Sequence, residues 1–142
     1  VGQDTDGTVT PLDLNLNWMI GKKKKDFIGK RSLSRSDIVR EDRKQLVGIL
    51  PLNKAYGIEE GQHVIEQENL STPIKEPVKM LGHITSSYFS PTLNHCVAMA
   101  LIKDGNRKVG TQLFVSTSNL NIIPVEVVKP GFIDPKNEKL LS

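Results

Sequence analysis

The sequence is poor in cysteine, in aromatic residues and in long apolar runs, and each shortage excludes a class of protein. Its 142 residues include one Cys, so no disulfide can form within the chain. No apolar run approaches the roughly 20 residues that a membrane-spanning helix needs. The first residues carry no basic and then apolar pattern of a secretion signal. We therefore expect a cytoplasmic protein that has no membrane partner.

The chain also lacks a large excess of charge of one sign, because 19 Lys and Arg residues nearly balance 16 Asp and Glu residues. The net charge of +3 is too small to mark a nucleic-acid-binding surface. The one dense positive run, residues 22–25, lacks the interleaved aromatic residues that would stack on bases. Because four neighbouring ammonium groups repel one another, we expect this run to lie in solvent or against an anion. Nucleic acid is not an expected partner.

Short apolar runs separated by Gly and Pro fill residues 45–142 and predict six strands. We expect these strands at residues 46–50, 63–68, 78–86, 96–103, 112–116 and 122–128. No helical pattern lies between them, which is typical of an antiparallel barrel or sandwich. Asp104-Gly105-Asn106 separates two of the apolar runs and predicts a hairpin turn.

The first 44 residues differ from the rest in being polar and highly charged, with a weak helical pattern. Thr10 before a Pro predicts the start of a helix, although the alternating Leu residues at 12–16 fit an extended segment as well. Asp26 predicts the cap of a second helix over residues 28–36, with Ile28 facing inward. We expect a short mixed segment with one or two helices.

Candidates for metal or nucleophilic chemistry are weak. The three His residues and Cys96 show no ligand spacing, and Cys96 within an apolar run predicts a small core residue. Asp4 and Asp6 precede Gly7, but a calcium loop needs Gly at its sixth position and Glu at its twelfth. The hydroxyl groups of residues 85–90 have no evident His or Asp partner. We expect neither a metal site nor nucleophilic catalysis.

Several stretches, spread over nearly the whole chain, together match a known family in their order and spacing. They are DTDGTVTP at residues 4–11, NWMI at 17–20, DFIGKRSL at 26–33, RKQLVG at 43–48 and GHITSSYFSPTL at 82–93. Together they resemble the glycine-cleavage T-protein (aminomethyltransferase) family. Within it, residues 3–8, 22–25 and 85–88 most resemble the C-terminal region of the alpha subunit of heterotetrameric sarcosine oxidases. A free T-protein or a dimethylglycine-oxidising relative stays an alternative.

The resemblance implies a mainly β fold in two parts. Residues 45–142 would form the family's C-terminal domain, a six-stranded antiparallel Greek-key barrel. Residues 1–44 would be the tail of the preceding folate-binding aminomethyltransferase domain, plus the connector into the barrel. The chain starts without Met, and we expect it to be part of a longer protein. The acidic catalytic residues of the family lie upstream, so the resemblance implies no catalytic residue here.

The resemblance also implies a role in one-carbon transfer. The parent complex would oxidise sarcosine and pass the carbon unit to tetrahydrofolate, which gives glycine and 5,10-methylenetetrahydrofolate. Its FAD, FMN and NAD would be bound outside this chain, whose partners would be the preceding folate-binding domain and other sarcosine oxidase subunits.

Three side chains of this chain are implied as cofactor-binding residues. Lys24 and Lys25 stand where T-proteins often have an Arg that contacts the folate tail, and Lys offers a carboxylate only a point charge. Tyr88 is a candidate wall of the folate pocket. The alternative is that the barrel serves as a non-catalytic docking module for neighbouring domains or subunits.

Overall fold

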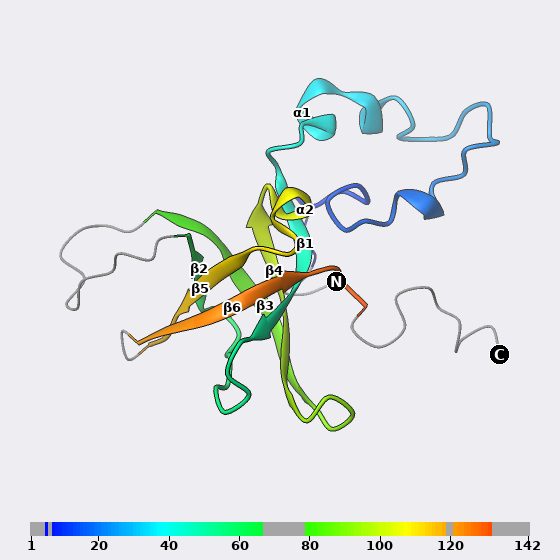
Figure 1. Cartoon of the computed structure of the whole chain (residues 1–142). Coiled ribbons are helices and arrows are strands. Elements are labelled where there is room, and N and C mark those ends of the chain that lie inside the picture. The colour runs from blue at the N-terminus through cyan, green and yellow to red at the C-terminus, as the bar shows by residue number, and fades with distance from the viewer. Residues whose placement is uncertain (1–4, 6, 67–78, 119–120, 132–142) are drawn as a thin grey trace.

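The computed structural model describes residues 5, 7–66, 79–118 and 121–131. Six strands form a closed barrel in which every pairing is antiparallel: β1 (Lys44–Pro51), β2 (His63–Ile65), β3 (Met80–Ser90), β4 (His95–Lys103), β5 (Gln112–Ser116) and β6 (Ile122–Val128). The order around the barrel is β1-β4-β3-β2-β5-β6 (Figure 1). Consecutive strands β2 to β4 are neighbours and β1 returns beside β4, which is a Greek key. The predicted fold class is confirmed.

The strand boundaries follow the alternation of apolar side chains. β5 and β6 begin and end at the predicted residues, and alternate residues of each point into the barrel. β3 runs on to Ser90, four residues beyond the predicted end at 86. β2 ends at Ile65, and residues 67, 68 and 78 of the predicted strands lie outside the described residues.

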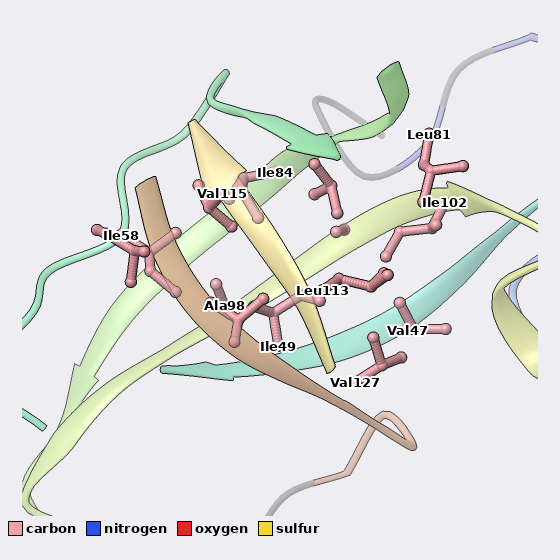
Figure 2. Packing of buried hydrophobic residues seen from close by; sticks show 14 residues of the cluster. Val47, Ile49, Ile58, Leu81, Ile84, Ala98, Ile102, Leu113, Val115 and Val127 are labelled. Carbon is pink, nitrogen blue, oxygen red and sulfur yellow. The ribbon is translucent and has the colours of Figure 1, made fainter. Parts of the chain in front are cut away.

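The core fills the inside of the barrel with aliphatic side chains from all six strands and from Ile58 (Figure 2). In β1 and β4 the register places Val47 opposite Ala100 and Ile49 opposite Ala98, and all four are buried. Burying one such branched side chain contributes about 1.5–3 kcal/mol. The inside of the barrel is therefore filled by a packed cluster of buried side chains.

Gly82 allows β3 and β4 to approach each other closely. A Cβ built at this position would lie 1.9 Å from the backbone oxygen of Leu101. The pairing register of β3 also shifts close by, between Ile84 and Ser86. Because a carbonyl oxygen cannot yield as a flexible side chain does, only Gly fits here.

The hairpin predicted at Asp104-Gly105-Asn106 is wrong, because β4 pairs with β1 and β3 and not with β5. Asp104 has the left-handed φ of 61° that a turn would use, but it leads into the one-turn helix α2 (Gly105–Lys108). This helix packs on β1, where Asn106 N donates to Gln45 Oε1 at 2.8 Å. The chain therefore turns at Asp104 as predicted, but the strand before the turn does not pair with the strand after it.

The segment before the barrel holds two 3-10 turns, η1 (Asn17–Met19) and η2 (Ser32–Ser34), and the short helix α1 (Ser36–Val39). The helix predicted over residues 28–36 is therefore wrong. Gly29 has a φ of 88°, which a helix does not tolerate, and Ile28 is fully exposed. Among the helices of the described residues, none is long and apolar enough to cross a membrane.

Candidate functional site

Lys24 and Lys25 lie in an exposed loop between η1 and η2. The ammonium group of Lys30 donates hydrogen bonds to the backbone oxygens of Lys24 at 2.9 Å and of Lys25 at 2.6 Å. The backbone N of Lys24 also donates to Gly21 O at 3.2 Å, which curls the loop. Neither lysine side chain forms an ion pair with the described part of the chain. Both lysines are exposed to solvent.

Tyr88 lies near the end of β3, where it is 65% exposed beside an equally exposed Phe89. This end of β3 is opposite to the start of β1, from which the lysine loop extends (Figure 1). The structure therefore does not bring Tyr88 together with Lys24 and Lys25. The role of each as a folate contact remains a prediction.

An ion pair that the sequence did not reveal joins Asp13 to Arg43, the residue directly before β1. The Asp13 carboxylate accepts hydrogen bonds from Arg43 Nε at 3.0 Å and Nη2 at 2.9 Å. Asp13 is 3% exposed and the Arg43 side chain 19% exposed. Arg43 also donates to the backbone oxygens of Thr8 and Asp37. This arrangement is bidentate, which makes it stronger than a single charged hydrogen bond.

Thr10 completes the surroundings of Asp13. Its backbone N and its Oγ1 both donate to Asp13 Oδ2, at 2.9 and 2.8 Å. Leu14 N donates to Thr10 O, so Thr10 begins a single helical turn, and the spacing is that of a capping box. Burial raises the pKa of Asp13, but the hydrogen bonds from Arg43 and Thr10 outweigh it and hold the pKa below its ordinary value. The hydrogen bond to Asp13 raises the pKa of Arg43.

This turn covers a free edge of β1. β6 pairs only with Gly48 to Pro51 of β1, which leaves the first half of β1 without that neighbour. There Leu46 N donates to Asp13 O at 2.7 Å, and Asn15 Nδ2 donates to Leu46 O at 3.3 Å. A free strand edge invites pairing with other chains, so this contact protects it.

A cavity of about 450 Å³ lies beside the Asp13–Arg43 pair, at the end of the barrel where β1 and β3 begin and β4 ends. Its wall joins the start of the chain to three strands. The lining includes Thr8, Val9, Asp13, His83, Leu101 and Lys103. The cavity is both charged and apolar, which is the character of a site for a small polar molecule.

A second cavity of about 470 Å³ lies at the opposite end, between the β1–β2 loop and the β5–β6 connection. Tyr56, Glu59 and Gln62 line one side, and Thr117 and Asn121 line the other. Glu59 is its one ionisable carboxylate, so the described lining offers no acid–base pair. We assign no chemistry to this cavity.

Cys96 packs against the core, as predicted, and is partly buried. Its Sγ lies 3.2 Å from Ser87 Oγ, whose hydroxyl donates to Ile58 O. His95 directs its Nδ1 to the backbone oxygen of Cys96 and not to the thiol. Within the described ranges, no group of three or more His, Cys, Asp and Glu residues could hold a metal ion.

Comparison with known proteins assigns this barrel to a family. Residues 44–134 match the glycine cleavage T-protein C-terminal barrel domain. The match covers more than half of the chain, and the chain belongs to this family. An aminomethyltransferase T of the glycine cleavage system from Bartonella henselae has the same fold, with a TM-score of 0.71 and 24% identity over 89% of this chain and 33% of that one.

More particularly, the chain is similar to sarcosine oxidase subunit alpha. It is 41% identical to that of Corynebacterium sp. (strain P-1) over 98% of the chain, and 33% identical to that of Rhizobium meliloti over 96%. An aminomethyltransferase from Thermosipho melanesiensis is 33% identical over 92%. The chain spans 14% of the length of each of these two alpha subunits and 32% of the aminomethyltransferase.

Proposed function

We propose that this chain is the C-terminal part of a sarcosine oxidase alpha subunit and supports tetrahydrofolate-dependent one-carbon transfer. The likeness to such a subunit, 41% identity over 98% of the chain, carries the proposal, and aminomethyltransferase follows with 33% over 92%. In this proposal the parent complex converts sarcosine to glycine and 5,10-methylenetetrahydrofolate. The catalytic carboxylates and the sites for FAD, FMN and NAD belong to other parts of the complex, so this chain alone is inactive.

The lysine loop fits the acidic tail of a folate. Tetrahydrofolate supplies the nitrogens that accept the one-carbon unit, and its tail ends in carboxylates. Lys24 and Lys25 present two ammonium groups that are exposed and carry no ion pair to the described residues, while Lys30 holds their backbone. An ammonium group binds a carboxylate as a point charge. In this proposal the loop orients the folate tail and takes no part in the chemical step.

The test uses the complete sarcosine oxidase complex. Lys24→Ala/Lys25→Ala should weaken tetrahydrofolate affinity, measured calorimetrically, by about fivefold or less, since one exposed charge contact is worth about 1 kcal/mol at most. Lys54→Ala, another exposed lysine, is the matched control and should leave affinity unchanged. Unchanged affinity in the double variant removes the lysine role alone. If the unaltered complex releases formaldehyde and forms no methylenetetrahydrofolate with sarcosine and tetrahydrofolate, the proposed function falls.

A second candidate is a docking module, either in an aminomethyltransferase or in a dimethylglycine-oxidising relative. Four large apolar side chains favour it, because they lie exposed in the β1–β2 loop and in the last residues of β3: Leu52, Tyr56, Tyr88 and Phe89. Exposed apolar groups gathered at one end of a domain mark a contact surface. A folate titration of the chain, followed by NMR, separates the two candidates. Shifts at residues 22–25 and at Tyr88 support folate binding, and no shifts support docking.

A further inference from the structure

The cavity beside the Asp13–Arg43 pair holds more positive charge than its own acids neutralise. Among the described residues of its lining, the Arg and Lys side chains are Arg40, Arg43, Lys44 and Lys103, and the acidic ones are Asp13 and Asp42. Arg43 is paired with Asp13, and Arg40 Nε lies 3.2 Å from Asp42 Oδ1. These pairs use both acids. The side chains of the two lysines form no ion pair or hydrogen bond with the part of the chain that the structure describes.

The strand register places these two lysines directly opposite each other. Lys44 of β1 pairs with Lys103 of β4, and antiparallel partners carry their side chains on the same face of the sheet. Like charges that lie directly opposite in a sheet destabilise the pairing. An anion with two negative charges, bound between the two ammonium groups, would turn this repulsion into attraction.

The rest of the cavity selects the kind of anion. Val9, Met80, Leu81 and Leu101 supply an apolar wall, and the ring of His83 also lies in the lining. A volume of about 450 Å³ exceeds the need of a bare ion and is within the range of small-molecule sites. A concave site of this size fits a small molecule better than the carboxylate of another protein.

We propose that Lys44 and Lys103 bind a phosphate group, at a site separate from the lysine loop and independent of the proposed function. A phosphate monoester carries nearly two negative charges at neutral pH, which matches the two unpaired ammonium groups. Its oxygens accept hydrogen bonds from both lysines, and an attached organic group lies against the apolar wall. Asp13 and Asp42 stay neutralised by their own arginines.

The experiment is a titration of the full chain with inorganic phosphate and with phenyl phosphate, at constant ionic strength, followed by NMR. Saturable shifts should appear at the amides of Lys44 and Lys103, with millimolar affinity. Lys44→Gln/Lys103→Gln should weaken that affinity at least tenfold, whereas Lys54→Gln, an exposed lysine in the β1–β2 loop, should not change it. Tighter binding of the ester assigns the site to a phosphorylated small molecule, and tighter binding of the free ion assigns it to inorganic phosphate; both support the proposal.

The double variant also has a readout that does not depend on binding. Without phosphate it should unfold at the same temperature as the natural chain or a higher one, since it lacks the repulsion across β1 and β4. Phosphate should raise the unfolding temperature of the natural chain more than chloride does at equal ionic strength, and should not do so for the double variant. The proposal is overturned if neither probe gives saturable shifts, if the shifts fall only on residues 22–25, or if the folded double variant binds as tightly as the natural chain.

Discussion

The barrel and the segment before it belong to one chain but are held together differently. All buried hydrophobic residues among those described lie between Leu46 and Val127, whereas residues 7–43 bury only the charged Asp13. The same segment exposes four large apolar side chains: Trp18, Met19, Ile28 and Val39. The barrel thus has a buried hydrophobic core, although it also exposes some apolar side chains at one end, and the described part of the segment has no such core. The difference teaches that an ion pair within the segment and a few hydrogen bonds to β1 can hold a segment that has no core.

This contrast supports the division of the chain that the sequence predicts, with residues 1–44 as the tail of a preceding domain and 45–142 as the barrel. The apolar side chains left exposed on the segment would pack against that preceding domain. The division remains a proposal. If it holds, changes in the barrel should cost much stability, and changes in the segment little.

The largest expected effect comes from Gly82→Ala. The added Cβ would collide with the backbone of β4 at Leu101 O, so β3 and β4 must separate. We expect a loss of about 4 kcal/mol or more in the free energy of unfolding, measured in urea. Gly57→Ala is the matched control, because nothing lies within 4 Å of its Cβ, and its change should stay within about 0.5 kcal/mol. Equal effects at the two positions would contradict the close approach.

A pair of Ile→Ala changes tests the comparison most simply. Ile102 is fully buried in the barrel, and Ile28 in the segment is fully exposed. Ile102→Ala should cost about 3 kcal/mol, through lost burial and the cavity left behind. Ile28→Ala should cost less than about 0.5 kcal/mol. Urea unfolding of both variants checks this, and a large loss from Ile28→Ala would mean that the segment has a core of its own.

Arg43→Gln should release the segment without unfolding the barrel. It leaves the Asp13 carboxylate without its bidentate partner, which should lower the free energy of opening the segment by about 2 kcal/mol. The amide of Leu46 reports this directly, because it donates to Asp13 O and not to another strand. Its hydrogen exchange should become roughly thirtyfold faster, while exchange in β4 stays unchanged. Arg43→Lys keeps the positive charge but loses the two-pronged guanidinium. Its Leu46 exchange rate should lie between those of the unaltered chain and Arg43→Gln. Unchanged Leu46 exchange in Arg43→Gln would show that other contacts hold the segment.

Acid should have the smallest effect, and again on the segment first. The pKa of Asp13 is lowered in the folded chain by Arg43 and Thr10 against the opposing effect of burial. Its contribution to stability is therefore fully present above the ordinary Asp pKa of about 3.9 and is lost as the pH falls through the folded pKa. The Leu46 amide resonance should shift in that range before the barrel unfolds. In Asp13→Asn the Leu46 resonance should not shift in this pH range. An identical shift in that variant would mean that another group titrates there.

The sequence predicted the strands well where alternation alone decides them, as in β5 and β6. It missed the end of β3, because Ser87 looks polar, whereas in the fold residues 87–90 pair with β4 and the Ser87 hydroxyl donates to Ile58 O, 29 residues away. The prediction of a helix over residues 28–36 was wrong because Gly29 has a left-handed conformation. The spacing of apolar residues does not indicate such a conformation. Local pattern thus predicts elements, and it does not predict the contacts that extend or break them.

The sites were harder to predict than the fold. Thr10 before a Pro predicted the start of a helix, but Arg43 lies 30 residues beyond Asp13 and only the folded chain pairs the two. Lys44 and Lys103 become neighbours only through the pairing of β1 with β4, two strands that are not consecutive. A run of consecutive lysines such as residues 22–25 can be found from the sequence alone. A pair assembled by register cannot.

Amide hydrogen exchange across the full chain, followed by NMR, tests the difference between the two parts most directly. We expect that amides of β4 and β6, and those of β1 that bond to these two strands, exchange only through global unfolding, whereas those of residues 17–39 exchange through far cheaper local opening. Equal protection in both parts, lost together in urea, would contradict it. The segment and the barrel would then be one cooperative unit.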